Sequence, residues 1–237
     1  MPERTRPGPY RQVDVLASLS PDERAKVLAY AQRRQFQAGA TLYMTGDHSA
    51  TLYILSEGIA RTYWTGAGGR ELTVGVWMPG DLVGAPDVAT GRRALSAAAL
   101  RDVVAYEFSA ESLKAASQEV PAFGWGLVLA LSFKVRWVSM IAANLRTKDA
   151  MTRLCELIVM LGDVYGDHSG EKVTIATKFT QEELALMIGC TRQWTSRSLT
   201  ELRQRKILAM GEHGTMQFDR AAIRRFLARR QGISAAR

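Results

Sequence analysis

The spacing of hydrophobic residues changes along the chain, and each change predicts a different kind of structure. Between about Gln35 and Phe108, short runs rich in Val, Ile, Tyr, Trp and Thr alternate with turn residues, which is typical of an antiparallel β-roll or sandwich. A capped helix is expected before these strands, at Pro21–Arg33, and another after them, from Ser109 to Pro121. The expected strands are Phe36–Tyr43, Thr51–Leu55, Ile59–Trp64, Glu71–Trp77 and Val103–Phe108.

From about Ala122 to Leu145 the apolar residues recur at helical spacing. One row steps by four and three residues, as in a coiled-coil seam, with Lys134 as its polar interruption. A second row lies on a neighbouring face, so we expect one face to meet a second copy of the chain and the other to pack on the β-roll. A core helix of a monomer is the alternative. The first row is Leu127, Leu131, Lys134, Val138, Ile141 and Leu145, and the second is Ala130, Phe133, Trp137 and Met140.

Composition narrows the class of protein. The net charge of +8 favours anionic partners. Two cysteines and three widely separated histidines are too few for a disulfide framework, an iron–sulfur site or most metal enzymes, so we expect no metal site and no cofactor. Lys134 and Arg136 interrupt the apolar stretch Val120–Leu145, and Met1–Pro7 lacks the apolar core of a signal peptide. We therefore expect no membrane helix and a cytoplasmic location.

The stretch Phe179–Ala209 carries the most informative motif, two short helices joined by a tight turn. Thr180 and Glu183 form a capping box at the start of the first helix, and Gly189 is placed to end it. Thr191 is expected to cap the second helix. The inward row of the second helix is then Thr195, Leu199 and Leu202. The motif predicts a helix-turn-helix, with an ordinary pair of packed helices as the alternative.

The outward face at the start of the second helix offers side chains that read DNA. In a helix-turn-helix these positions reach base edges in the major groove, where Arg pairs with guanine and Gln with adenine. Thr180 and Gln181 are placed for phosphate contacts, which position the protein without reading sequence. The expected DNA-binding residues are Arg192, Gln193, Ser196, Arg197, Thr180, Gln181 and Thr191.

Elements around this motif complete a basic C-terminal part. Asp149 is expected to cap a helix that runs to Gly162, followed by a loop at Tyr165–Glu171. The segment Met210–Phe218 is expected to form a hairpin wing, and Asp219 to cap a terminal helix. The arginines of that helix contact either DNA or only solvent. They are Arg220, Arg224, Arg225, Arg229 and Arg230.

A β-roll, a long helix, a hinge and a C-terminal winged helix-turn-helix, in this order, resemble the CRP/FNR superfamily of bacterial transcription regulators, over roughly Gln35 to Phe226. The family's recognition helix carries an Arg-Glu-x-x-x-Arg pattern, which Arg192 and Arg197 match. Gln193 stands where the family has Glu, and because Gln prefers adenine, the resemblance implies a half-site related to, but different from, that of the cyclic-AMP receptor. The turns that resemble the family's cyclic-nucleotide-binding β-roll are Gly46-Asp47, Gly58, Gly69-Arg70-Glu71 and Pro79-Gly80-Asp81.

The ligand side of the resemblance carries substitutions. The family's cassette has a Gly-Glu-Leu segment for the ribose hydroxyl and an Arg-Ser pair for the cyclic phosphate. The aligned residues here are Gly84-Ala85-Pro86 and Arg93-Ala94, without the carboxylate and the hydroxyl. Cyclic AMP is therefore not expected to bind tightly. Gly84 and Arg93 stay as candidates for an effector pocket, Arg93 either holding another acid or phosphate or lying on the surface. The effector is unknown.

Together these patterns predict an α+β chain with an N-terminal antiparallel β-roll at 10–120, a dimerisation helix and hinge at 121–148 and a winged helix-turn-helix at 149–237. We expect a homodimeric, sequence-specific regulator, not an enzyme, that binds a palindromic double-stranded DNA site; the resemblance also implies RNA polymerase as a partner. One alternative is a cupin-like β-roll enzyme, for which the β-roll offers only His48 as a histidine ligand. The other is a nucleotide-gated scaffold without DNA binding, which leaves the outward Arg192, Gln193 and Arg197 unexplained.

Overall fold

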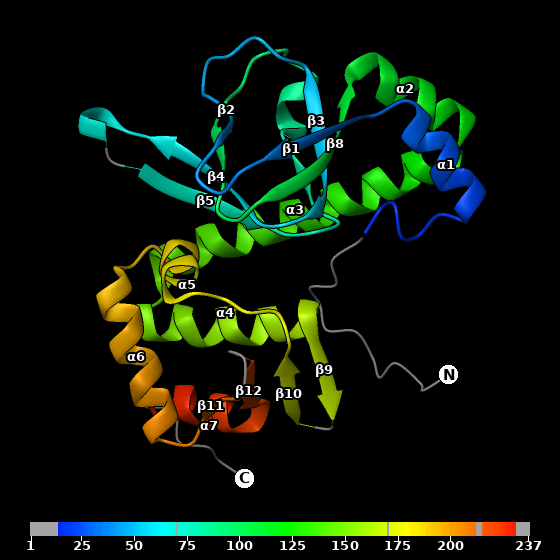
Figure 1. Ribbon diagram of the computed structural model, residues 1–237. Coiled ribbons are helices and arrows are strands. Elements are labelled where there is room, and N and C mark those ends of the chain that lie inside the picture. The colour runs from blue at the N-terminus through cyan, green and yellow to red at the C-terminus, as the bar shows by residue number, and fades with distance from the viewer. Residues whose placement is uncertain (1–13, 70, 170, 212–214, 231–237) are drawn as a thin grey trace. The chain divides into compact units, whose positions relative to one another are not determined.

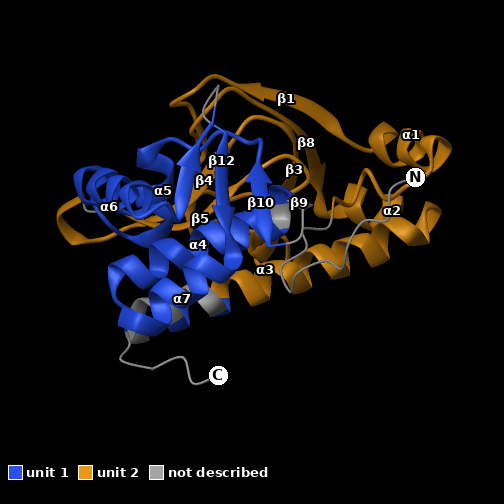
Figure 2. Cartoon of the chain, turned by 90° about the horizontal axis from the view of Figure 1, so that it is seen from below, with its two compact units in different colours: residues 1–11, 139–237 blue, residues 12–138 orange. Residues whose placement is uncertain are grey.

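A computed structural model describes residues 14–69, 71–169, 171–211 and 215–230 (Figure 1). The chain divides into two compact units, and the division falls inside one long helix, between Val138 and Ser139 (Figure 2). We call residues 12–138, orange in Figure 2, the first unit, and it is built on antiparallel sheets. The second unit, blue in Figure 2, is built on helices with a small sheet. This is the α+β architecture that the sequence predicts.

The first unit contains two antiparallel sheets of the β-roll. One has the strand order β1-β8-β3-β6 and the other the order β2-β7-β4-β5. The strands of the first sheet are β1 (Gln32–Phe36), β8 (Val103–Ser109), β3 (Thr51–Glu57) and β6 (Leu82–Val83). The strands of the second are β2 (Thr41–Tyr43), β7 (Ser96–Ala99), β4 (Ala60–Thr65) and β5 (Glu71–Trp77). Two short 3-10 turns, η1 (Ala67–Gly69) and η2 (Ala85–Val88), lie in the connections.

Helices α1 (Pro21–Ala29) and α2 (Ala110–Glu119) flank the first sheet. Both begin where the sequence predicts, because Ser20 forms a capping box with Glu23 and Ser109 accepts a hydrogen bond from the Ser112 amide at 3.1 Å. The hydrophobic core joins the sheet to these helices and to the first half of α3 (Pro121–Thr147). Its fully buried members include Val27 of α1, Ile54 of β3, Leu82 of β6, Phe108 of β8 and Phe123 of α3.

Several expected boundaries are wrong in the first unit. The first helix ends at Ala29, and Gln32 and Arg33, which are expected at its end, belong instead to β1, which pairs with β8. Of the strand expected at Phe36–Tyr43, only Phe36, at the end of β1, and Thr41–Tyr43, which form β2, lie in strands. The strands β6 and β7 were not expected from the sequence.

Helix α3 carries apolar side chains on two faces, of which one is covered. Ala130, Phe133 and Trp137 of the second predicted row are buried, with exposed fractions of 4%, 9% and 4%. Another apolar face of the helix is exposed, and Val135 reaches 66% exposure. The exposed apolar residues are Trp125, Val128, Leu129, Leu131, Val135 and Val138.

The exposed row is displaced from the seam that the sequence predicts. Leu127 of the predicted seam packs against the core, and Lys134 lies with its Nζ atom 2.9 Å from the centre of the Trp77 ring. The centre of the exposed face is therefore about one residue, or about 100° of helix rotation, away from the expected row. Leu131 and Val138 lie at its edge. The side chains of Met140, Ile141 and Leu145 lie outside the described part of the structure.

The second unit holds α4 (Ala150–Tyr165) and the two helices of the predicted motif, α5 (Gln181–Ile188) and α6 (Arg192–Gln204). Asp149 caps α4 as predicted, accepting from the Thr152 amide at 3.0 Å. A sheet of order β11-β12-β10-β9 lies beside these helices, and α7 (Arg220–Arg230) follows it. The strands are β9 (Gly166–Ser169), β10 (Lys172–Ile175), β11 (Leu208–Met210) and β12 (Met216–Asp219).

The wing is confirmed and the preceding loop is corrected. Strands β11 and β12 pair antiparallel, as a hairpin wing requires, while residues 212–214 between them lie outside the described residues. The segment expected to be a loop at Tyr165–Glu171 instead contains β9, which pairs with β10. Asp219 accepts from the Ala222 amide at 2.8 Å and so caps α7 as expected.

Candidate functional site

The helix-turn-helix has the local geometry that its sequence predicts. Thr180 accepts from the Glu183 amide at 3.1 Å, and a Glu183 carboxylate oxygen accepts from the Thr180 amide at 2.7 Å, so the capping box is complete. Helix α5 ends at Gly189, whose φ of 65° is the left-handed conformation that glycine adopts without strain. Thr191 then accepts from the Trp194 amide at 3.2 Å and caps α6. The turn between the helices is therefore fixed at both ends.

Helix α6 buries one face and exposes the other. The predicted inward residues Thr195, Leu199 and Leu202 are all buried, together with Ser198, which the sequence analysis did not place inside. Figure 1 shows α6 at the outer edge of its unit, with α5 beside it. Burial of the inward face fixes the rotation of the helix about its axis.

The expected DNA-reading residues lie together on the outward side of α6. Arg192, Gln193 and Arg197 are exposed, and Ser196 is partly exposed. Residues 192 and 196, and residues 193 and 197, are one helical turn apart, so the four side chains form two adjacent short rows at the N-terminal end. The expected phosphate-contact residues, Thr180, Gln181 and Thr191, are also exposed, at the N-terminal ends of α5 and α6.

Arg153 of α4 is a further part of this site that the sequence analysis missed. Its Nε donates to the Ile188 carbonyl at 3.1 Å, and its Nη1 donates to the Lys148 carbonyl at 2.9 Å. Its Nη2 also lies 3.5 Å from the Cys190 sulfur in the turn. The guanidinium therefore ties α4 to the end of α5. No local pattern in the sequence links these residues, because 35 positions separate Arg153 from Ile188.

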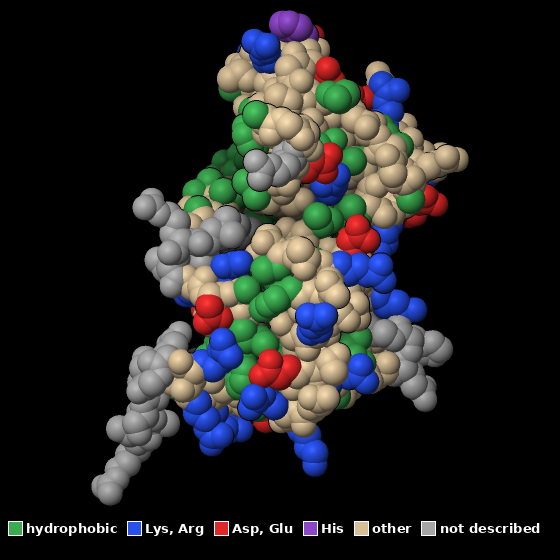
Figure 3. All heavy atoms as spheres, turned by 90° about the vertical axis from the view of Figure 1, so that its left-hand side faces the viewer, with side chains coloured by type: hydrophobic (Ala, Val, Ile, Leu, Met, Phe, Trp, Pro, Cys, Tyr) green, Lys and Arg blue, Asp and Glu red, His purple; other side chains and the backbone are tan. Residues whose placement is uncertain are grey.

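The surface of the second unit is rich in basic side chains. Figure 3 shows Lys and Arg gathered over the face that carries α6. A cavity of about 580 Å³ lies between the end of α6 and α7, and Phe226 in its lining has Arg205 and Arg230 within 5.5 and 5.8 Å of its ring centre. Arg205 pairs with Glu201 and Arg230 with Asp149, so two of these cations already have acidic neighbours. The cations that line the cavity are Arg205, Lys206, Arg225, Arg229 and Arg230.

In the first unit, the candidate pocket residue Arg93 is buried rather than on the surface. Its exposed fraction is 2%, so a surface position for this arginine is wrong. Nη1 donates to the Thr51 carbonyl at 2.7 Å, and Nη2 donates to the Thr51 hydroxyl at 2.6 Å. The guanidinium carbon lies 3.9 Å from the centre of the Tyr43 ring, which is a cation–π arrangement.

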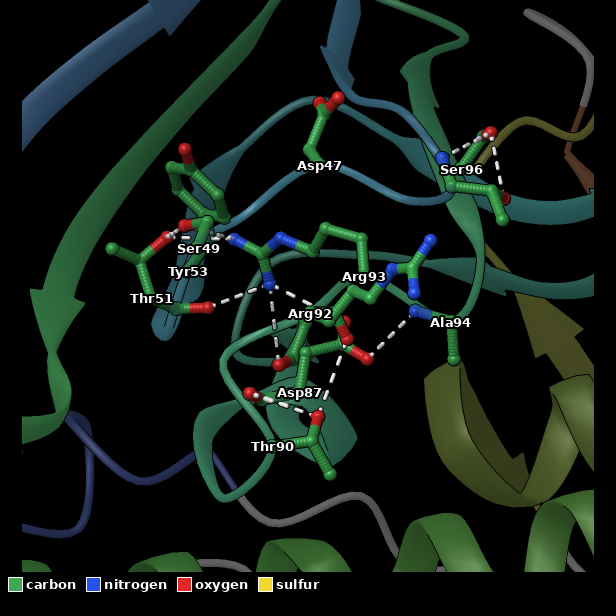
Figure 4. Close-up of polar contacts among 12 residues, drawn as sticks. Asp47, Ser49, Thr51, Tyr53, Asp87, Thr90, Arg92, Arg93, Ala94 and Ser96 are labelled. Carbon is green, nitrogen blue, oxygen red and sulfur yellow. Dashed lines mark hydrogen bonds and ion pairs between the residues drawn. The ribbon is translucent and has the colours of Figure 1, made fainter.

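Asp87, from η2, faces this arginine. Asp87 is also buried, at 4% exposure, and its Oδ2 lies 3.4 Å from Arg93 Nη1. Its Oδ1 accepts from the Ala94 amide at 3.0 Å. Gly84, the other candidate pocket residue, has φ of 84°, and a Cβ atom there would lie 2.3 Å from Arg93 Nη1. Figure 4 shows the Asp87 carboxylate and Arg93 pointing toward one another.

Other chemistry in the described residues is sparse. They contain no group of three or more His, Cys, Asp or Glu side chains placed to hold a metal ion. Cys155 is buried in α4, and burial raises the pKa of its thiol to about 12, so it is not a nucleophile at neutral pH. His48 is exposed and forms an isolated antiparallel β-bridge with Arg92. None of the described helices combines the length and the apolar character that a membrane crossing requires.

Two family models match the chain. The model of the cyclic nucleotide-binding domain matches residues 33–119, and the model of the Crp-like helix-turn-helix domain matches residues 152–226. A global nitrogen regulator of Synechococcus elongatus is 26% identical over 195 residues, which are 81% of this chain and 88% of that protein. A cyclic AMP receptor protein of Thermus thermophilus is 27% identical over 207 residues, or 86% and 92% of the two chains.

Solved structures share the fold. A mutant of CooA from Carboxydothermus hydrogenoformans superposes with a TM-score of 0.75 at 23% identity, covering 94% of this chain and 98% of that one. FixK2 from Bradyrhizobium japonicum superposes with a TM-score of 0.69 at 19% identity, covering 87% and 98%. The relatives are regulators rather than enzymes, so the cupin-like enzyme has no support among them.

Proposed function

The chain belongs to the CRP/FNR superfamily of transcription regulators, and on this basis we propose that it acts as a homodimer that binds a palindromic DNA site in a sequence-specific manner. The observation that carries the proposal is the outward face of α6. Arg192, Gln193 and Arg197 are exposed there, while the opposite face of the helix is buried. In a helix-turn-helix this is the end of the recognition helix that enters the major groove.

The half-site follows from these side chains. Arg192 and Arg197 each present a guanidinium that can donate two hydrogen bonds to guanine O6 and N7. Gln193 presents an amide that pairs with adenine N6 and N7. Thr180, Gln181 and Thr191 contact phosphates and set the register without reading bases. We propose that the half-site contains guanines for the two arginines and an adenine for Gln193.

The exposed apolar face of α3 is the proposed dimer surface. Trp125, Val128, Leu129 and Val135 lie on it, with exposed fractions between 40% and 66%. Large apolar side chains that gather on one face of a helix mark an interaction surface in a soluble protein. A second copy of the same helix offers a matching apolar face, and a two-fold dimer presents two recognition helices to half-sites about 34 Å apart. This pairing predicts a palindromic site.

Control by cyclic AMP is not part of the proposal. Ala85 and Ala94 occupy the positions where the superfamily holds the ribose hydroxyl and the cyclic phosphate, and neither offers a side-chain hydrogen bond. A site built around a ribose hydroxyl loses binding free energy of several kcal/mol, on the order of a thousandfold or more in affinity, without its partner. The proposed sensor is therefore degenerate, and we assign it no effector. The other parts of the proposal concern assembly, partner and location. The segment 121–148 acts as the dimerisation helix and the hinge. RNA polymerase is the partner that the superfamily implies, and the protein works in the cytoplasm, where it meets the DNA that it binds.

Binding to duplex DNA at several salt concentrations tests the proposal. The logarithm of the binding constant should fall steeply and linearly with the logarithm of salt concentration, because phosphate contacts release counterions. Arg192→Ala should weaken binding to the preferred site by about 5–150-fold and relax base preference at one position. Gln181→Ala should weaken binding to all sequences alike. Binding that is insensitive to salt and to Arg192→Ala would exclude DNA recognition by α6.

A further inference from the structure

The Asp87 carboxylate uses both of its oxygens within the protein. Oδ1 accepts from the Ala94 amide at 3.0 Å, and Oδ2 lies 3.4 Å from Nη1 of Arg93. The backbone of Asp87 is also anchored, since its carbonyl accepts from the Gly91 amide at 2.8 Å. A guanidinium and the amide of the next residue thus converge on one buried anion.

Asp87 is the sole acidic partner of Arg93 among the described residues. The other hydrogen-bond acceptors around the guanidinium are neutral: the Thr51 carbonyl and hydroxyl, the Ser49 hydroxyl and the Gly84 carbonyl. Arginine does not lose its proton inside proteins, so a buried guanidinium needs an anion beside it. With Asp87 in place, Arg93 is only 2% exposed and is shielded from anions in solution.

One N–H donor of the Arg93 guanidinium makes no hydrogen bond. Arg93 Nε is buried and has no hydrogen-bond partner within the described residues. Asp87 therefore neutralises the charge of Arg93 without saturating its hydrogen bonds. An anion with more acceptor oxygens than a carboxylate, such as a phosphoryl group, could use such a donor.

We propose that Arg93 and the Ala94 amide form an anion-binding site whose resident anion is the Asp87 carboxylate, and that phosphoryl or carboxylate ligands enter this site only when that carboxylate is removed or displaced. The protein thus carries its own anion inside the β-roll, and Arg93 needs no anion from an effector. The site lies in the β-roll, the sensor domain of the proposed function, and that function names no effector for it.

Inorganic phosphate is the probe that tests the site. In Asp87→Ala, phosphate should raise the melting temperature saturably, by about 5–10 °C at about 100 times its Kd, and titration calorimetry should show the same binding. Wild type, measured at the same phosphate concentrations and at ionic strength matched with chloride, supplies the baseline for the general effect of phosphate on stability. Asp87→Ala combined with Arg93→Met should return to that baseline.

Asp47→Ala is the matched control. Asp47 is an exposed carboxylate in the same part of the β-roll, and its side chain accepts from the Met44 amide at 2.8 Å rather than from Arg93. Its removal should leave the response to phosphate at the wild-type baseline. A saturable response in wild type equal to that of Asp87→Ala would overturn the proposal, because the site would then be open already. So would a folded Asp87→Ala protein with no saturable response.

Loss of folding does not block the test. If Asp87→Ala unfolds in chloride, refolding in phosphate should recover the folded protein, and Asp87→Asn, which keeps the shape of the side chain, should show the same dependence on phosphate. Failure of phosphate to rescue both variants would overturn the proposal. Since every readout is stability or anion binding, failure here leaves the proposed DNA recognition by α6 unaffected, and failure of DNA binding leaves this result unaffected.

Discussion

Nε of Arg153, on α4, donates a hydrogen bond to the carbonyl of Ile188, the last residue of α5, over 3.1 Å. The last carbonyls of a helix have no partner within the helix, and a cation at this end also interacts favourably with the helix dipole. The bond links α4 to the C-terminal end of α5, directly before the turn that leads to α6. A side chain of α4 thus helps to position the proposed recognition helix.

Replacing this side chain should reveal its role. Arg153→Ala should lower the free energy of unfolding by about 1–3 kcal/mol, because it leaves polar groups near the turn without their donor. It should also weaken binding to every DNA sequence alike, as the turn loosens. Urea unfolding and DNA titration measure the two effects. Arg24→Ala, which removes an exposed arginine of α1, is the matched control, and equal losses in both variants would contradict a positioning role.

Base preference should follow the side chain at position 193. Gln193→Glu replaces an amide that pairs with adenine by a carboxylate that accepts from cytosine N4. The preferred base at one half-site position should change from adenine to cytosine, with a discrimination of about 1–3 kcal/mol, and selection from a randomised duplex library measures it. Arg203→Ala, at the opposite end of α6, should leave the selected sequence unchanged. An unchanged selection by Gln193→Glu would remove Gln193 from the set of base-reading residues.

A charge on the exposed face of α3 should separate the proposed dimer. Val135 is 66% exposed, so Val135→Asp should leave the fold of one chain intact while placing an unpaired carboxylate in the interface. The dissociation constant of the dimer should rise about tenfold or more, as measured by sedimentation. Leu72→Asp changes a side chain of β5 that is 48% exposed and should not alter assembly. A dimer that survives Val135→Asp unchanged would place the interface elsewhere.

Lys134 should make stability depend on pH. Burial lowers the pKa of Lys134 from 10.5 to about 7, and Asp81 opposes this shift only in part. Between pH 7 and 10.5 the unfolded chain therefore binds this proton and the folded chain does not, so stability rises with pH in that window. Below about pH 7 both states are protonated, and the cost of charging the folded state is fully present.

Comparison with Lys134→Met isolates this dependence. The variant should be more stable than wild type near pH 6, and the difference should shrink as pH rises, with a slope of at most about 1.4 kcal/mol per pH unit. Urea unfolding between pH 6 and 9 measures both curves. Parallel curves would mean that the amine keeps its proton over Trp77, held by the cation–π contact.

The features that the sequence predicts best are those that depend on residues close together in the chain. The capping box of Thr180 and Glu183, the cap at Asp149 and the glycine end of α5 depend on residues within a turn of one another, and all three are confirmed. Strand β7 was missed because Ser96–Ala99 consists of serine and alanine, which have little β-propensity, and its pairing with β2 and β4 is long-range.

Residues that depend on tertiary contacts were harder to predict. Helix α3 is apolar on two faces, so periodicity alone could not tell which face the β-roll covers, and the expected seam was displaced. The sequence leaves Arg93 open between a ligand-binding position and the surface, because no local pattern predicts whether a single arginine is buried. Its burial depends on Asp87 and Thr51, which are brought to it by a turn and by β3.

The carboxylate inside the sensor has an evolutionary consequence. The codons for alanine, asparagine and glycine each differ from that for aspartate by a single base. In the proposed anion site, a single base change in codon 87 would thus free Arg93 to hold an external anion, without altering α6. Inducible descendants of this protein are therefore to be sought first among natural variants that have lost the acid at position 87.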